Sequence, residues 1–140
     1  TNNGMDYLIS RWAQDFSQIT RIDQYISPGY LAGEHKSCMN FIHMTINKLV
    51  NFRTVMVTHH APSKSCIDYT SGDRCVDDFF AVDLDNFILN NRQIKYWVYG
   101  HNHHRKIFTM GDTVVISNAK GYPGQRDHAT WTCKYGRFEI

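Results

Sequence analysis

Two short histidine clusters are the residues of this chain with the clearest capacity for chemistry. Five of the eight histidines fall in them, at 59–60 and within 101–104. Each cluster directly follows a short apolar run, 54–58 in one case and 96–100 in the other. Neutral imidazole is the commonest metal ligand among side chains, and clustered ligand residues mark sites. The two clusters together predict one shared metal or phosphate site.

Two buried β-strands are the elements that would position these histidines. The runs Thr-Val-Met-Val-Thr (54–58) and Tyr-Trp-Val-Tyr (96–99) are β-branched and aromatic, which is typical of buried strands. A helix expected over 76–90 lies between them, so the order indicates a βαβ unit with a parallel strand pair. Because ligands bind at the C-terminal ends of parallel strands, both clusters are expected at the same edge of the sheet.

The remaining pattern predicts helices before this unit and hairpins after it. The further elements expected are one amphipathic helix or two short ones over 5–25, a helix over 31–50, a loop over 61–75, a hairpin of 106–110 and 113–117, a loop over 118–128 and a last hairpin over 130–140. The hairpins indicate a mixed or antiparallel edge on the sheet.

Three histidines are the strongest ligand candidates: His59, His101 and His103. In an extended backbone the side chains of residues i and i+2 point to the same side, so His101 and His103 would reach one metal or two adjacent metals. Gly100 would let the backbone turn sharply and approach closely. By the same alternation His60 and His104 would point elsewhere, and each is either a neighbour of the ligands or merely solvated.

Composition and charge limit the class of protein. With 140 residues, 42% of them hydrophobic, the chain is expected to form a single domain over 1–140. The net charge of +2 and the scattered Lys and Arg do not indicate nucleic acid, and no apolar stretch approaches the roughly 18 residues of a membrane span. Four cysteines without a Cys-x-x-Cys pair, and no secretory signal pattern, predict reduced thiols and a cytoplasmic protein. The absence of an initiator Met before Thr1 indicates a fragment or a processed chain.

Three segments resemble the C-terminal half of a calcineurin-like metallophosphoesterase of the bacterial and phage type. They are Val-Thr-His-His-Ala-Pro-Ser (57–63), Tyr-Gly-His-Asn-His (99–103) and Ser-Asn-Ala-Lys-Gly-Tyr-Pro-Gly (117–124). The resemblance is strong over 54–125 and weak before it. It implies an α/β fold, namely the C-terminal half of a four-layer α/β/β/α sandwich with mixed sheets.

The resemblance also implies a metal-dependent phosphoesterase, which hydrolyses a phosphate mono- or diester with a metal-bridged hydroxide. The implied cofactors are two divalent metal ions, and Mn, Fe and Zn all accept imidazole. His59 and His101 would bind one ion and His103 the other. His60 would be the catalytic residue that binds phosphate or orients a ligand.

Part of the family's pattern is missing. Its N-terminal half supplies an Asp-x-His, a Gly-Asp-x-x-x-Asp type segment and a Gly-Asn-His-Asp/Glu, and none of these precedes the first strand; the Asp73 to Asp77 spacing lies between the later motifs. The site would then be completed by a missing N-terminal segment or by a partner chain, and this chain would be inactive alone. Two alternatives stay open: a non-catalytic binding or assembly module that retains half of the fold, and a structural zinc site of His59, His101 and His103.

Overall fold

The computed structural model describes residues 15–67, 80–125 and 128–133. The chain divides into two compact units, Thr1–Lys48 and Leu49–Ile140. The single domain expected over 1–140 stays a prediction. Both histidine clusters belong to the second unit.

The first unit contains a short helix and a small hairpin where a longer helical region was expected. Helix α2 (Asp15–Gln18) is followed by strands β1 (Thr20–Arg21) and β2 (Gln24–Tyr25), which pair antiparallel. Ile22 and Asp23 have φ angles of 48° and 61°, the left-handed values that a two-residue hairpin turn requires. The helix expected over 5–25 is therefore wrong from residue 20 onward, and residues 5–14 lie outside the described ranges.

Helix α3 (Pro28–Lys48) confirms the helix expected over 31–50 but begins three residues earlier. Ser27 precedes it, and its Oγ atom accepts a hydrogen bond from the Tyr30 N–H at 3.2 Å. Pro28 occupies the first turn, where its missing N–H costs nothing. The Ser-Pro pair therefore starts this helix.

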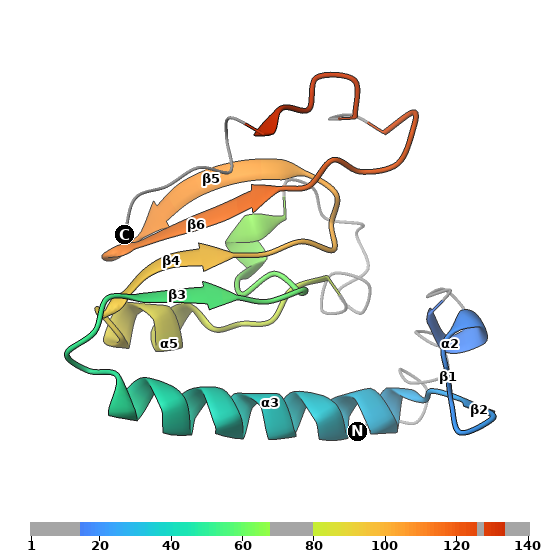
Figure 1. The fold of residues 1–140 in the computed structure, drawn as a ribbon, viewed down its shortest axis with the longest axis horizontal. Helices are drawn as coiled ribbons and strands as arrows, with labels where there is room; N and C mark the ends of the chain where they lie inside the picture. Colours follow the sequence, from blue (N-terminus) through green and yellow to red (C-terminus); the bar gives the residue numbers. More distant parts are fainter. Residues whose placement is uncertain (1–14, 68–79, 126–127, 134–140) are drawn as a thin grey trace. The chain divides into compact units, whose positions relative to one another are not determined.

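A mixed four-stranded sheet forms the second unit (Figure 1). Its strands are β3 (Thr54–Val57), β4 (Ile94–Val98), β5 (Arg105–Met110) and β6 (Thr113–Asn118), in the order β3-β4-β6-β5. Strand β4 pairs parallel with both β3 and β6, whereas β5 pairs antiparallel with β6 through the tight turn at Gly111. This arrangement confirms the α/β class, the parallel pair and the hairpin predicted after it.

Among the described residues of the connection from β3 to β4, the expected helix is interrupted at 81–84. A short 3-10 helix, η1 (Lys64–Cys66), lies in the predicted loop. Of the predicted 76–90 helix, the described residues confirm Phe80 and α5 (Asp85–Asn90) as helical. Residues 81–84 are not helical, because Val82 donates to the Ala61 carbonyl and Leu84 to the Pro62 carbonyl, both at 2.9 Å. These bonds occupy backbone N–H groups that a helix would use within itself. Residues 68–79 lie outside the described ranges.

The core of the second unit includes residues of the two central strands, β4 and β6. Trp97, Ile94 and Val115 are fully buried, and Ile88 of α5 is 1% exposed. The ring of Phe87 in α5 meets Trp97 edge to face, with centroids 6.2 Å apart. Helix α5 therefore packs against β4 through its apolar side.

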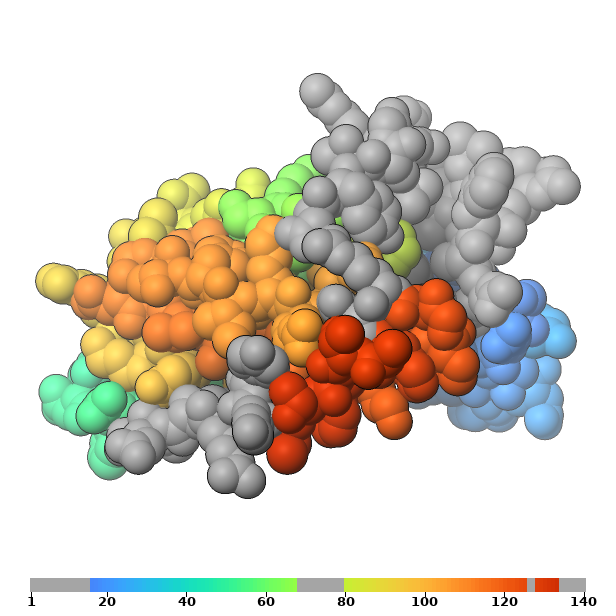
Figure 2. Space-filling model, turned by 90° about the horizontal axis from the view of Figure 1, so that it is seen from above, coloured from blue at the N-terminus to red at the C-terminus, as the bar shows by residue number. Residues whose placement is uncertain are grey.

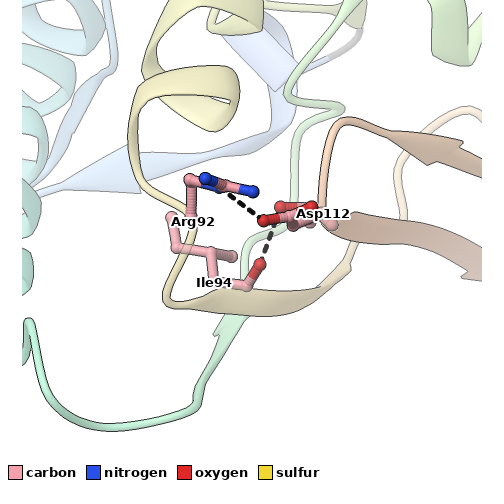
Figure 3. Close-up of polar contacts among 4 residues, drawn as sticks. Arg92, Ile94 and Asp112 are labelled. Carbon is pink, nitrogen blue, oxygen red and sulfur yellow. Dashed lines mark hydrogen bonds and ion pairs between the residues drawn. The ribbon is translucent and has the colours of Figure 1, made fainter.

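An ion pair joins the two turns at the end of the sheet away from the histidines (Figure 3). The Arg92 Nε–H, just before β4, donates to Asp112 Oδ2 in the β5–β6 turn at 2.7 Å. Beside it, the Thr113 hydroxyl donates to the Ile94 carbonyl at 2.7 Å. The hydrogen bond from Arg92 lowers the pKa of the Asp112 carboxyl, and the Arg92 charge adds to the effect.

Two further expectations concern the end of the chain and membranes. The hairpin expected over 130–140 falls mostly outside the described residues, and 128–133 contain no strand. Among the described helices, none has the length and apolar character needed to cross a membrane.

Candidate functional site

The two histidine clusters meet because β3 and β4 are in parallel register. Val57 pairs with Val98, so both strands end at the same level. The pairing continues past the strand ends: Thr58 N–H donates to the Val98 carbonyl and Gly100 N–H to the His59 carbonyl, each at 3.0 Å. The sheet therefore brings the residues after both strands to one edge, as the sequence predicted.

Three imidazoles lie together at this edge. The Nδ1 atom of His101 is 3.2 Å from the Nε2 atom of His59. The ring centroids of His60 and His101 are 4.5 Å apart, and those of His59 and His60 are 5.3 Å apart. Phe80 covers the His101 ring at 5.0 Å between centroids. His101 therefore has two imidazole neighbours, His59 and His60, and one apolar neighbour, Phe80.

His60 is held through its backbone. Its carbonyl accepts a hydrogen bond from the Thr58 hydroxyl at 2.8 Å. The same Thr58 oxygen accepts the indole N–H of the fully buried Trp97 at 2.9 Å. A buried side chain of β4 therefore orients the turn that follows β3.

The backbone around His101 and His103 is not extended, contrary to expectation. Their φ angles are 66° and 52°, in the left-handed region, whereas Gly100 is absent from the residues with positive φ. Left-handed backbone costs a non-glycine residue about 1–2 kcal/mol. The prediction that alternation places both side chains on one side is therefore wrong for this segment. A Cβ atom at Gly100 would lie 3.7 Å from the His59 Nδ1 and carbonyl oxygen atoms, an ordinary contact, so the approach to His59 does not require glycine.

His103 lies beside the loop that follows β6. Its ring meets the Tyr122 ring edge to face, with centroids 4.8 Å apart. Gly121 has φ of 70°, and a Cβ atom there would lie 3.5 Å from the Cβ of His103. Gln125 closes this loop by accepting the Tyr122 N–H at 2.6 Å. The ring of His103 is therefore positioned by the segment after β6.

Tyr122 offers an exposed aromatic surface next to His103. Its side chain is 67% exposed. In the space-filling view the segment after β6, in red, lies on the surface of this unit (Figure 2).

Asn102 is the residue of this site that sequence reasoning did not select. It is 7% exposed, and its Nδ2 atom donates to the Cys66 carbonyl at 3.2 Å. The Tyr99 hydroxyl donates to the same carbonyl at 3.5 Å. In the sequence, the position of Asn102 between two candidate ligands was a signal. Local sequence does not, however, reveal a hydrogen-bond partner 36 residues away.

Cys66 is a buried thiol in the segment whose carbonyl Asn102 contacts. Its side chain is fully buried, and burial raises the pKa of the thiol, although a hydrogen bond with Tyr99 opposes this. Cys38, Cys66 and Cys133 are free, which agrees with the expected reduced state for these three.

The geometry of His59 and His101 fits two ligands of one ion. Two nitrogens bound to an ion at about 2.1 Å lie about 3.0 to 3.4 Å apart in octahedral or tetrahedral coordination. The observed separation of 3.2 Å falls in this range. Across residues 15–67, 80–125 and 128–133, however, no three His, Cys, Asp or Glu side chains are arranged to hold a metal ion. The described residues therefore offer a pair of ligands, and His103 does not join this pair around a single ion.

Comparison with known proteins adds one distant relative. The chain is 26% identical over 130 residues to the uncharacterized protein L509 of Acanthamoeba polyphaga mimivirus. The match covers 86% of this chain and 46% of the viral protein, so the chain spans less than half of that relative's length. No family model matches the chain, and no solved structure matches it.

Proposed function

We propose that the second unit carries the histidine side of a two-metal phosphoesterase site. The observation that carries this proposal is the 3.2 Å separation of His101 Nδ1 and His59 Nε2 at the C-terminal ends of two parallel strands. Strand ends of this kind are where α/β proteins bind ligands. The resemblance of 54–125 to the C-terminal half of a calcineurin-like metallophosphoesterase supports the reaction class.

In this proposal each histidine has a separate role. His59 and His101 hold one divalent ion, either Mn, Fe or Zn, and His103 holds a second. Divalent ions in such a pair supply Lewis acidity and a nucleophile at neutral pH. His60, whose ring lies 4.5 Å from that of His101, donates a hydrogen bond to a phosphate oxygen of the substrate.

Residues outside the described part of this chain complete the site. Two imidazoles leave most positions of an ion unfilled, and a two-metal site takes several carboxylates as well. In the proposed arrangement these come from a further segment of a longer chain or from a partner chain. The fold would then be the C-terminal half of a four-layer α/β/β/α sandwich, with the described sheet as one of its two sheets.

The test is hydrolysis by the natural gene product that contains this sequence and by residues 1–140 alone. Each would be incubated with Mn²⁺ and p-nitrophenyl phosphate or bis(p-nitrophenyl) phosphate. The proposal expects metal-dependent turnover by the natural product, its near-complete loss in His101→Ala, and no turnover by residues 1–140 alone. Robust turnover by the isolated chain would contradict the completion from outside.

If the natural product shows no turnover, one of two other functions explains the site. If the natural product binds a second protein tightly but hydrolyses neither ester, a binding or assembly module replaces the enzyme. If metal analysis finds one zinc ion that persists through purification without hydrolysis, a structural zinc site replaces it. Both outcomes would overturn the phosphoesterase proposal.

A further inference from the structure

The turn that carries His101 and His103 has an anchor in the interior of the unit. Asn102 lies between the two histidines and is 7% exposed. Its Nδ2 atom donates to the Cys66 carbonyl at 3.2 Å, while its Oδ1 atom is buried with no partner among the described residues. Because a carbonyl oxygen only accepts, the amide must present Nδ2 to it. The orientation of the Asn102 side chain is therefore determined by this contact.

The acceptor belongs to a well-buried segment. Ala61, Pro62, Ser63 and Cys66 are all buried. Ser63 caps η1, since its Oγ atom accepts the Ser65 N–H at 3.0 Å. Ala61 also bridges to Ala81. The carbonyl that Asn102 contacts is thus part of a segment fixed by several independent contacts.

The turn needs such an anchor because its own backbone is unfavourable. His101 and His103, on either side of Asn102, both have left-handed φ angles. Non-glycine residues keep this conformation only where surrounding contacts impose it. The Asn102 N–H also donates to the Gly100 carbonyl at 2.9 Å, which tightens the turn further.

We propose that Asn102 is a positioning residue that holds the His101 ring against the His59 ring through its bond to the Cys66 carbonyl. Without this bond the left-handed turn relaxes and the Nδ1–Nε2 contact is lost. The geometric part of the inference stands independently, whereas its consequence for metal affinity rests on the proposed function. Outer groups that orient metal ligands change affinity by about 10- to 100-fold, and we expect about tenfold here.

The test compares two variants that each remove one donor from the same carbonyl. Asn102→Ala removes the amide of the turn, and the matched control Tyr99→Phe removes the hydroxyl that contacts Cys66 at 3.5 Å. The first readout is the nuclear Overhauser effect between the His59 and His101 rings. We expect it to fall at least about twofold in Asn102→Ala and to persist in Tyr99→Phe. An unchanged ring contact in a folded Asn102→Ala chain overturns the proposal.

Two further measurements test the role of Asn102 if Asn102→Ala does not fold. Asn102→Ser, which retains a shorter polar side chain, is expected to weaken the ring contact as well, and an intact contact there would also contradict the role. In the wild-type chain the Nδ2 protons of Asn102 should exchange slowly with solvent. Rapid exchange would show that the anchor does not form.

Zn²⁺ binding separates this inference from the proposed function. Weaker ring contact with about tenfold weaker Zn²⁺ binding in Asn102→Ala supports both. Weaker ring contact in a natural gene product whose wild type binds no Zn²⁺ keeps the positioning role and counts against the metal site. Unchanged ring contact with intact Zn²⁺ binding keeps the metal site and overturns the role of Asn102.

Discussion

The Nδ1 atom of His101 faces the Nε2 atom of His59 at 3.2 Å, across the ends of two parallel strands. The contact depends on sheet register, because the Gly100 N–H continues the ladder to the His59 carbonyl at 3.0 Å. Two imidazoles in this position either share a hydrogen bond or bind one ion with both lone pairs. Which of the two holds in solution is a question that metal titration answers.

Removing either ring should weaken metal binding by the natural gene product that contains this sequence. Four-ligand zinc sites bind with about 10–16 kcal/mol, so one ligand is worth roughly 3 kcal/mol, or about 100-fold in affinity. We therefore expect His59→Ala and His101→Ala to weaken Zn²⁺ or Mn²⁺ binding by about two orders of magnitude. Isothermal titration calorimetry on the folded variants measures this directly.

The control for these variants is His35→Ala. His35 is an exposed residue of α3 in the first unit, so this substitution removes an imidazole far along the chain from the pair. Its metal affinity should equal that of the wild type. Equal losses in all three variants would mean that the bound metal is not held by the pair.

The sheet was predictable from sequence, because local pattern and tertiary position agree there. The runs that became β3 and β4 are short, β-branched or aromatic, and bounded by polar residues. Residues that follow parallel strands must share an edge, so the meeting of His59 and His101 followed from topology alone.

The finer geometry was not predictable, because it depends on distant contacts. The left-handed backbone at His101 and His103 coincides with the contact of Asn102 to a carbonyl 36 residues earlier. Residues 81–84 fit a helical period but pair instead with the 61–62 backbone. Periodicity records which side chains are apolar and carries no information about such partners.

Thr58→Val should destabilise the second unit and disturb the turn at His60. Valine has the same shape but cannot accept the Trp97 indole N–H or donate to the His60 carbonyl. A buried donor left without a partner costs about 1–3 kcal/mol. Urea unfolding should show this loss. The matched control is Thr54→Val, because the Thr54 hydroxyl donates to the exposed Phe52 carbonyl at 3.2 Å. A loss of equal size in this control would contradict the role of Thr58.

Asp112→Asn should lower stability at neutral pH and have no effect in strong acid. Arg92 lowers the pKa of the folded Asp112 carboxyl, first through the hydrogen bond and then through its charge. In the unfolded chain the pKa of this carboxyl is about 3.9. The stabilisation is therefore complete above that pH and disappears as pH falls through the lower folded value. Added salt should weaken it as well, because both side chains reach solvent.

Unfolding curves between neutral pH and about pH 2 test this dependence, which linkage predicts. Asp83→Asn, a change at another exposed aspartate, is the control for removing one negative charge. The two variants should differ at neutral pH and converge in acid. A difference that stays constant across the range would contradict a contribution from the ionised carboxylate.

Cys66 should be the slowest of the three described thiols to react. Burial raises its pKa, so little thiolate forms near neutral pH, and the side chain is fully buried. Cys38 and Cys133 are exposed. Brief treatment with iodoacetamide followed by peptide mass spectrometry should therefore label Cys38 and Cys133 first and Cys66 only after unfolding. Equal labelling rates in the folded chain would contradict the burial of Cys66.

Glycine should stabilise the chain more than alanine at position 103 and less than alanine at position 104. His103 has φ of 52°, which costs an L-residue about 1–2 kcal/mol but is open to glycine. After the greater entropy of glycine in the unfolded chain is subtracted, His103→Gly should exceed His103→Ala by roughly 0.5–1 kcal/mol in free energy of unfolding. His104 is not among the residues with positive φ, so there the order should reverse by a similar amount. Urea unfolding of the four variants measures both differences. A preference for alanine at both positions would show that the turn beside the candidate ligands is not left-handed in solution.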